Sequence, residues 1–317
     1  MEITRELIED VAAKLGINEP SLVEKDYQVV RALSALTQVK CVNFELVFAG
    51  GTCLSKVFKN LQRMSEDVDI KILPTERGMQ LTNAARRRAL GNLKREIVEL
   101  LKSADFHIKE NQSHNENRYI ELGLSYSAIF IIASALRPTI KIELTLCDIE
   151  LGRADKKITS LIYQSLKKPP EIKTFSCAEV VHTAAEKLVA LLRRTAASLR
   201  GIDGWSDETL IRHMYDLRTI NKSLQLEDRF FDLVRDTVVS DGKQFQVKHP
   251  EFLENPCEEI KLALLALNEE KIYRDHYDKF LGPLVYAKTK PTYRQCLTTL
   301  NAISEKVWGS AISPHSK

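Results

Sequence analysis

Two aspartates that alternate along one short segment have the residue types and spacing to do chemistry. Asp67 and Asp69 begin the segment DVDIKIL, whose alternating polar and apolar residues predict a β-strand over 67–73. Side chains two residues apart on a strand point to the same side, so the two carboxylates are expected to lie together. Such a pair is stabilised by a cation, and Mg2+ commonly binds through one or two carboxylates and substrate phosphates. We therefore expect Asp67 and Asp69 to bind Mg2+ or Mn2+.

A glycine-rich turn precedes this pair by one amphipathic segment. Gly50, Gly51 and Thr52 follow an apolar run of strand composition, and the helical spacing of apolar residues begins after them. Backbone N–H groups at such a turn, and at the start of a helix, are suited to phosphate. Two alternating aspartates by themselves more often belong to an exposed acidic strand. The turn upstream favours metal-assisted phosphoryl or nucleotidyl transfer.

A third carboxylate is expected from a later strand, 139–146, in which polar and apolar residues also alternate. Glu143 lies on its polar face with Lys141. Two-metal transfer uses a further acidic group that binds the second metal and helps to activate the attacking hydroxyl. Glu143 is therefore a candidate catalytic residue and metal ligand, with Asp148 as the alternative. An exposed Lys/Glu pair on a sheet surface explains the same pattern.

A predicted helix over 178–200 carries two basic residues that share a face. Lys187 and Arg194 lie seven positions apart, which is two helical turns. They are able to offer two cations to a triphosphate. The alternative for Lys187 is an ordinary surface lysine whose stem covers the edge of the core while its charge stays in water.

Composition indicates an ordinary globular protein of 317 residues. The net charge of +3 is too small to argue for a polyanion as a general partner, but local basic clusters fit an RNA-sized substrate. The clusters are Arg86, Arg87, Arg88, Lys94 and Arg95; Lys156, Lys157, Lys167, Lys168 and Lys173; and Arg193, Arg194 and Arg200.

Cysteine spacing and hydropathy bear on the compartment. The six cysteines are scattered without a C-x-x-C pair, which argues against a disulfide framework and against a zinc site. The N-terminal segment is charged throughout, unlike a signal peptide, and the longest apolar run is too short to span a bilayer. We expect a cytoplasmic protein with no membrane partner.

The motifs around the turn and the aspartates resemble a known family. G-G-T-x-L-S-K from Gly50 and R-x-S-E-D-V-D from Arg63 are similar to the first motif of the AbiEii/AbiGii toxins. These are nucleotidyltransferases of the DNA-polymerase-β-like superfamily, found in type IV toxin–antitoxin and abortive-infection systems. Thr52 stands where serine is commoner in the superfamily, which keeps the hydroxyl. The resemblance implies that Lys56, Arg63 and Ser65 join the turn in binding the nucleotide.

Three other segments also resemble the family. E-K-L-x-A-L-L-x-R, residues 186–194, is similar to its third motif, which implies that Lys187 stabilises charge on the nucleotide phosphates. R-H-M-Y-D-L, residues 212–217, is similar to its fourth motif, which implies an active-site role for Asp216. E-K-D-Y, residues 24–27, resembles a segment that precedes the first motif. By itself it is a charged first turn of a helix, and we assign it no chemistry.

These patterns, with the fold that the resemblance implies, predict an α+β protein. Residues 1–150 are expected to form a polymerase-β-like nucleotidyltransferase core with a small mixed sheet, and residues 151–317 a helical bundle lobe that completes an active-site groove. A capping box is expected at Ser21 and Glu24, and one long basic helix over 76–103 with a weak point at Gly91. Residues 128–136 fit either a buried strand or a short helix, and 150–175 are expected to be irregular.

The function expected from these residues and the resemblance is metal-dependent nucleotidyl transfer (class 2.7.7). The resemblance implies that NMP passes from an NTP to an RNA, such as a tRNA 3′ end, so that growth or phage propagation is blocked. It also implies a cognate antitoxin, a DNA-binding regulator. Transfer to a hydroxyl of a protein or small molecule is one alternative. A catalytically silent NTP-binding module with the same fold is another.

Overall fold

The strands expected around the aspartates belong to one mixed sheet. The computed structural model describes residues 2–58, 61–133, 136–147, 151–202 and 207–309. Its seven-stranded sheet has the order β3-β4-β5-β2-β1-β7-β6. The β2–β5 and β1–β7 pairs are parallel and the others antiparallel. The strands are β1 (Phe44–Ala49), β2 (Val68–Pro74), β3 (His107–His114), β4 (Tyr119–Ser125), β5 (Ile140–Leu146), β6 (Arg153–Ile158) and β7 (Ile172–Ala178).

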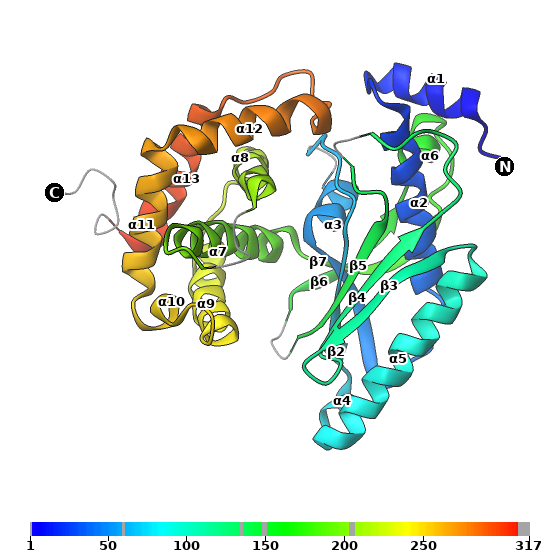
Figure 1. The fold of residues 1–317 in the computed structure, drawn as a ribbon, viewed down its shortest axis with the longest axis horizontal. Helices are drawn as coiled ribbons and strands as arrows, with labels where there is room; N and C mark the ends of the chain where they lie inside the picture. The colour runs from blue at the N-terminus through cyan, green and yellow to red at the C-terminus, as the bar shows by residue number, and fades with distance from the viewer. Residues whose placement is uncertain (1, 59–60, 134–135, 148–150, 203–206, 310–317) are drawn as a thin grey trace. The chain divides into compact units, whose positions relative to one another are not determined.

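Helices accompany this sheet in the first compact unit of the chain, which ends at Glu179. Figure 1 shows α2 and α5 as the long helices beside the sheet. The helices are α1 (Arg5–Leu15), α2 (Pro20–Leu36), α3 (Gly50–Val57), α4 (Glu76–Met79), α5 (Asn83–Ser103) and α6 (Leu161–Ser165). The mixed sheet with helices, followed by a helical second unit, confirms the predicted α+β class.

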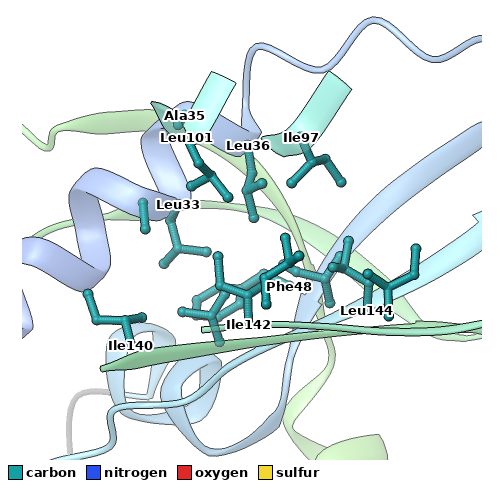
Figure 2. Packing of buried hydrophobic residues seen from close by; sticks show 14 of the residues in the cluster. Leu33, Ala35, Leu36, Phe48, Ile97, Leu101, Ile140, Ile142 and Leu144 are labelled. Carbon is teal, nitrogen blue, oxygen red and sulfur yellow. The ribbon is translucent and has the colours of Figure 1, made fainter. Parts of the chain in front are cut away.

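Alternation along the strands separates an apolar face from a polar face. Val68, Ile70 and Ile72 of β2 and the even-numbered residues of β5 are buried in the main apolar core, together with residues of α2 and α5. Figure 2 shows Leu36 and Leu101, from these two helices, above Ile142 and Leu144 of the sheet. The odd-numbered residues of β2 and β5 therefore project from the opposite face, as their alternation predicts.

The second unit, from Val180, is helical throughout its regular structure. Helix α7 packs against α8, α9 and α11, so it lies at the centre of this unit. None of the helices described in either unit is long and apolar enough to cross a membrane. The elements are α7 (Val180–Leu199), η1 (Glu208–Ile211), α8 (Arg212–Leu224), α9 (Asp228–Phe245), α10 (Pro250–Glu254), α11 (Pro256–Glu269), α12 (Lys271–Leu284) and α13 (Tyr293–Trp308).

The boundary between the units falls at residues 179/180, later than the predicted residue 150. The stretch 150–175 was expected to be irregular, but it contributes β6, α6 and most of β7. Strand β7 pairs with β1, and β6 completes the edge of the sheet. β6 is largely exposed and rich in charged residues, which hides the alternation that a half-buried strand shows.

The long helix predicted over 76–103 is wrong, because two helices occupy that range. Helix α4 ends at Met79 and α5 begins at Asn83. The hydroxyl of Thr82 accepts a hydrogen bond from the backbone N–H of Ala85 at 3.3 Å and so caps α5. Gly91 lies inside α5 without interrupting it.

The segment 128–136 forms neither a strand nor a helix in its described residues. Ile131 is 96% exposed, so this part is not the buried element that its apolar composition predicts. Side chains of α2 hold its backbone instead. The carboxylate of Glu24 accepts from the N–H groups of Ile129 at 2.7 Å and Phe130 at 3.1 Å.

The predicted capping box of Ser21 and Glu24 is therefore also wrong. Helix α2 begins at Pro20, and its N-cap residue Glu19 makes no side-chain capping bond. The Ser21 hydroxyl accepts from the backbone N–H of Ala133 at 3.2 Å, so both predicted capping side chains bind the loop between β4 and β5. A tertiary contact has replaced the local one.

Candidate active site

The glycine turn and the second aspartate are in close contact in the structure. Gly50 follows β1 and begins α3 with a φ of +70°, in the left-handed region that favours glycine. A Cβ atom at this position would lie 1.8 Å from Asp69 Oδ2 and 2.7 Å from Asp69 Cβ. Glycine therefore meets two requirements here, the backbone conformation and the approach to Asp69.

Thr52 connects the turn to the first aspartate. Its side chain is fully buried, and its hydroxyl donates a hydrogen bond to the backbone carbonyl of Asp67. The same hydroxyl lies 3.0 Å from the hydroxyl of Ser65. The contacts of Thr52 hold the segment 65–67 against α3, next to Gly51. Its predicted contact with the nucleotide stays a prediction.

The strand register places the second aspartate beside the predicted third carboxylate. Asp67 immediately precedes β2, which begins at Val68 rather than at residue 67. Asp69 lies on β2 and is the register partner of Glu143 on the parallel strand β5. Glu143 is in turn the partner of Glu121 on β4, so three carboxylates form a row across the polar face. Asp148, the alternative to Glu143, lies outside the described residues.

Glu143 is half-buried and surrounded by hydrogen-bond donors. It accepts from the Tyr119 hydroxyl at 2.8 Å and pairs with Lys141 at 2.5 Å. Lys141 also bonds Glu121, at 2.9 Å. Burial acts to raise the pKa of Glu143, but the bonds to Lys141 and Tyr119 outweigh it and lower that pKa. Glu143 is thus a carboxylate held in its charged form.

The donor atoms near the turn suit a hard divalent cation. Among the residues that the structure describes, no group of three or more His, Cys, Asp or Glu side chains is arranged to hold a metal by itself. Asp67 and Asp69 offer carboxylate oxygens, and Mg2+ is usually held by one or two carboxylates with water and substrate phosphates completing its shell. The residues present therefore fit a metal that binds together with a nucleotide.

The two cations predicted to bind the nucleotide beside the turn have internal partners. Lys56 is buried and pairs with Asp26 of α2. The guanidinium of Arg63 is also buried and donates to the carbonyl of Met64 at 2.8 Å. Their predicted nucleotide contacts stay predictions, but each residue has a structural role.

In the second unit the structure brings together the two residues of the third and fourth motifs. Lys187 of α7 and Asp216 of α8 form an ion pair of 2.9 Å, with side-chain exposures of 8% and 0%. Removing either partner of such a buried pair would strongly destabilise the fold, because the other charge would stay buried without a partner. Arg194, on the same helix as Lys187, is about a third exposed and pairs with Asp207 at 2.9 Å.

His213 lies beside this pair, and sequence reasoning assigned it no catalytic role. Burial lowers its pKa well below the ordinary value, and Lys187 and Arg212 act in the same direction, opposed by Asp216. The imidazole is therefore neutral in the folded protein at neutral pH. Its position next to Arg212 was the sequence signal for a cationic neighbour.

We expect His213 to make the folded state sensitive to acid. As the pH falls below about 6.5, the unfolded chain binds a proton that the folded chain excludes, so stability drops by up to about 1.4 kcal/mol per pH unit. Urea unfolding between pH 5 and 7.5 measures this. The His213→Gln variant is expected to lose less stability over that range than the wild type. Equal slopes would contradict the prediction.

Comparisons with known proteins identify the family. The sequence matches the family described as "Nucleotidyl transferase AbiEii toxin, Type IV TA system" over residues 33–299. The fold is similar to that of MenT4, a nucleotidyltransferase toxin from Mycobacterium tuberculosis H37Rv, with a TM-score of 0.57 and 18% identity. That alignment covers 98% of this chain and 94% of MenT4. No curated protein shows significant similarity to the sequence. The family match spans most of the chain and includes the turn, the aspartates, Lys187 and Asp216, so the chain belongs to the AbiEii family of nucleotidyltransferase toxins of type IV toxin–antitoxin systems.

Proposed function

We propose that this toxin transfers NMP from an NTP to an RNA, with a tRNA 3′ end as the acceptor, and so blocks growth or phage propagation. The observation that carries the proposal is the contact of the Gly50 turn with Asp69, beside Glu143. This joins a phosphate-binding backbone to carboxylates in a family of nucleotidyltransferases. Family membership implies an antitoxin, which we propose to be a DNA-binding regulator that acts with the toxin in the cytoplasm.

In this mechanism the residues of the first unit bind and orient the reactants. Asp67 and Asp69 would hold Mg2+ or Mn2+, which would offset phosphate charge when bound. The turn donates N–H groups to the triphosphate. Glu143, charged at neutral pH, accepts the proton of the acceptor hydroxyl as that oxygen bonds to the α-phosphorus. The bond from the α-phosphorus to the bridging oxygen breaks, and pyrophosphate leaves.

Two residues of the second unit also have proposed roles in the transfer. Lys187 offsets the negative charge that develops on the departing pyrophosphate. Asp216 accepts a hydrogen bond from Lys187 and fixes the position of the ammonium group. This assignment rests on the family motifs and on the burial of the pair.

The distribution of charge supports a polyanionic acceptor. The lysines on β6 and β7 and on the turn before β7 are exposed, and they give this edge of the sheet a positive surface that attracts phosphates. They are Lys156, Lys157, Lys167, Lys168 and Lys173. The arginines at the end of α7 and just after it contribute less to a positive surface, because each has an acidic partner. Arg193 pairs with Asp241, Arg194 with Asp207, and Arg200 with Glu259.

The test is label transfer from each of the four α-32P-labelled NTPs to total RNA in the presence of Mg2+. We expect the wild type to label RNA with a preferred NTP and the Asp67→Ala/Asp69→Ala double variant to label nothing. Label on protein would support the alternative of protein modification. NTP binding with no transfer to RNA, protein or small molecules would support the silent module. Either result would overturn the proposal.

A further inference from the structure

The loop between β4 and β5 ends in an arginine whose backbone is held on both sides. The N–H of Arg137 donates to the carboxylate of Glu66 at 3.0 Å. Its carbonyl accepts from the ammonium of Lys25, which also pairs with Glu66 and donates to the carbonyl of Thr139 at 3.1 Å. Lys25 is fully buried, so this clamp lies in the interior of the first unit.

The clamp determines where the side chain of Arg137 can reach. Glu66, which binds its backbone, directly precedes the first aspartate of the pair. The guanidinium Nη1 lies 3.2 Å from Asp67 Oδ1, and the Arg137 side chain is 50% exposed. A permanently charged, planar donor group therefore lies against a predicted metal ligand and remains open to solvent.

We propose that Arg137 binds the triphosphate of the NTP, an inference that rests on the proposed function of Asp67 and Asp69. Arginine presents a rigid fork of N–H donors that matches phosphate oxygens, and it keeps its charge at any physiological pH. A metal held by Asp67 would also bind the phosphates of the nucleotide, which would bring them within reach of the guanidinium. The guanidinium of Arg137 would then replace its hydrogen bond to Asp67 by hydrogen bonds to phosphate oxygens, while its backbone stays in place.

The stability gained from the ion pair with Asp67 does not explain why Lys25 and Glu66 hold the backbone of Arg137. The Arg137 side chain is half exposed and that of Asp67 is 17% exposed, so solvent screens the pair, and we expect it to contribute only about 1 kcal/mol to stability. The clamp, in contrast, takes the charge of Lys25 out of water, and burial lowers the pKa of that lysine against the opposing effect of Glu66. Burying charges to fix one exposed arginine is expected where the position of that arginine matters for binding.

The inference also gives a role to the E-K-D-Y segment of α2. Glu24 binds the N–H groups of Ile129 and Phe130, Lys25 binds the carbonyl of Arg137, and Asp26 pairs with Lys56 on α3. These three consecutive charged residues thus fasten the Arg137 loop and the helix after the glycine turn to one helix. We assign them a positioning role, which acts through Arg137 and α3.

The experiment measures nucleotide binding without an acceptor, by calorimetry with the four non-hydrolysable α,β-methylene NTP analogues and saturating Mg2+. We expect Arg137→Gln to weaken binding about 10- to 100-fold, the range for one charge-assisted hydrogen bond. Arg137→Lys is expected to recover part of the loss, because lysine keeps the charge but lacks the fork. The control is Arg153→Gln. Arg153 is 41% exposed and pairs with Glu45, at the opposite end of β1 from the turn, so wild-type binding is expected.

Three results would overturn the inference. Unchanged analogue binding in Arg137→Gln, with the KM for RNA raised instead, would assign the arginine to the acceptor. Tighter Mn2+ binding by Arg137→Gln, with unchanged analogue binding, would make Arg137 only a counter-ion of Asp67. A wild type that binds no analogue would overturn both this inference and the proposed function. A wild type that binds the analogue but transfers nothing refutes the transfer alone, and its Arg137 variants still test the inference.

Discussion

Replacing Asp69 by asparagine is expected to lower kcat for NMP transfer about 1,000-fold or more. The substitution removes one of the charges that we propose to hold the metal, and with it several kcal/mol of transition-state stabilisation. Asparagine has nearly the same shape, so the contact with the Gly50 turn is retained. Asp69 also lies beside Glu143, and their side chains share a hydrogen bond. The amide of asparagine keeps a group that donates to Glu143, so the free energy of unfolding is expected to stay equal. Single-turnover transfer and urea unfolding measure the two quantities.

The row of carboxylates supplies a matched control for this variant. Glu121→Gln removes a carboxylate from the other end of the row, where Glu121 is bonded to Lys141 and Tyr119. Its kcat is expected to change less than 10-fold, because glutamine keeps hydrogen-bonding capacity and Glu121 is assigned no metal. If Glu121→Gln lowered kcat as much as Asp69→Asn does, only the total negative charge of the row would matter for transfer. The specific metal-binding role proposed for Asp69 would then be wrong.

The sheet could be predicted from the sequence because alternation is a local property. Val68, Ile70 and Ile72 face the core on β2 simply because every second residue does. Residues 128–136 lacked such a signal. Their apolar composition fitted a buried element, but their backbone partners are Glu24 and Ser21, over 100 residues away in sequence. Tertiary hydrogen bonds of this kind leave no periodicity.

The candidate site was predicted in part for the same reason. The turn and the aspartates are close in sequence, and a family motif covers both. The position of Glu143 beside Asp69 depends on the parallel pairing of β2 with β5, which alternation does not reveal. Arg137 and the E-K-D-Y clamp were missed because charged residues in a first helical turn usually face solvent, whereas Lys25 is buried.

The second large effect is expected from Gly50→Ala, which should abolish transfer and destabilise the fold. A left-handed φ costs a non-glycine residue about 1–2 kcal/mol. The larger cost comes from the contact with Asp69, since the new Cβ would lie 2.7 Å from Asp69 Cβ. Rotation of the Asp69 side chain moves its carboxylate but not its Cβ, so α3 or β2 must shift. Either shift displaces Asp69, the proposed metal ligand, from the turn that we propose to bind phosphate.

Gly16→Ala separates these two costs. Gly16 caps α1 with a φ of +67°, close to the +70° of Gly50, but a Cβ there would have no atom within 4 Å. Gly16→Ala is therefore expected to lose only the conformational cost and to keep full transfer activity, and Gly50→Ala to lose clearly more stability, measured by urea unfolding. Equal losses, with activity retained in Gly50→Ala, would show that the turn tolerates a side chain. In that case transfer activity would not depend on the close approach of the turn to Asp69.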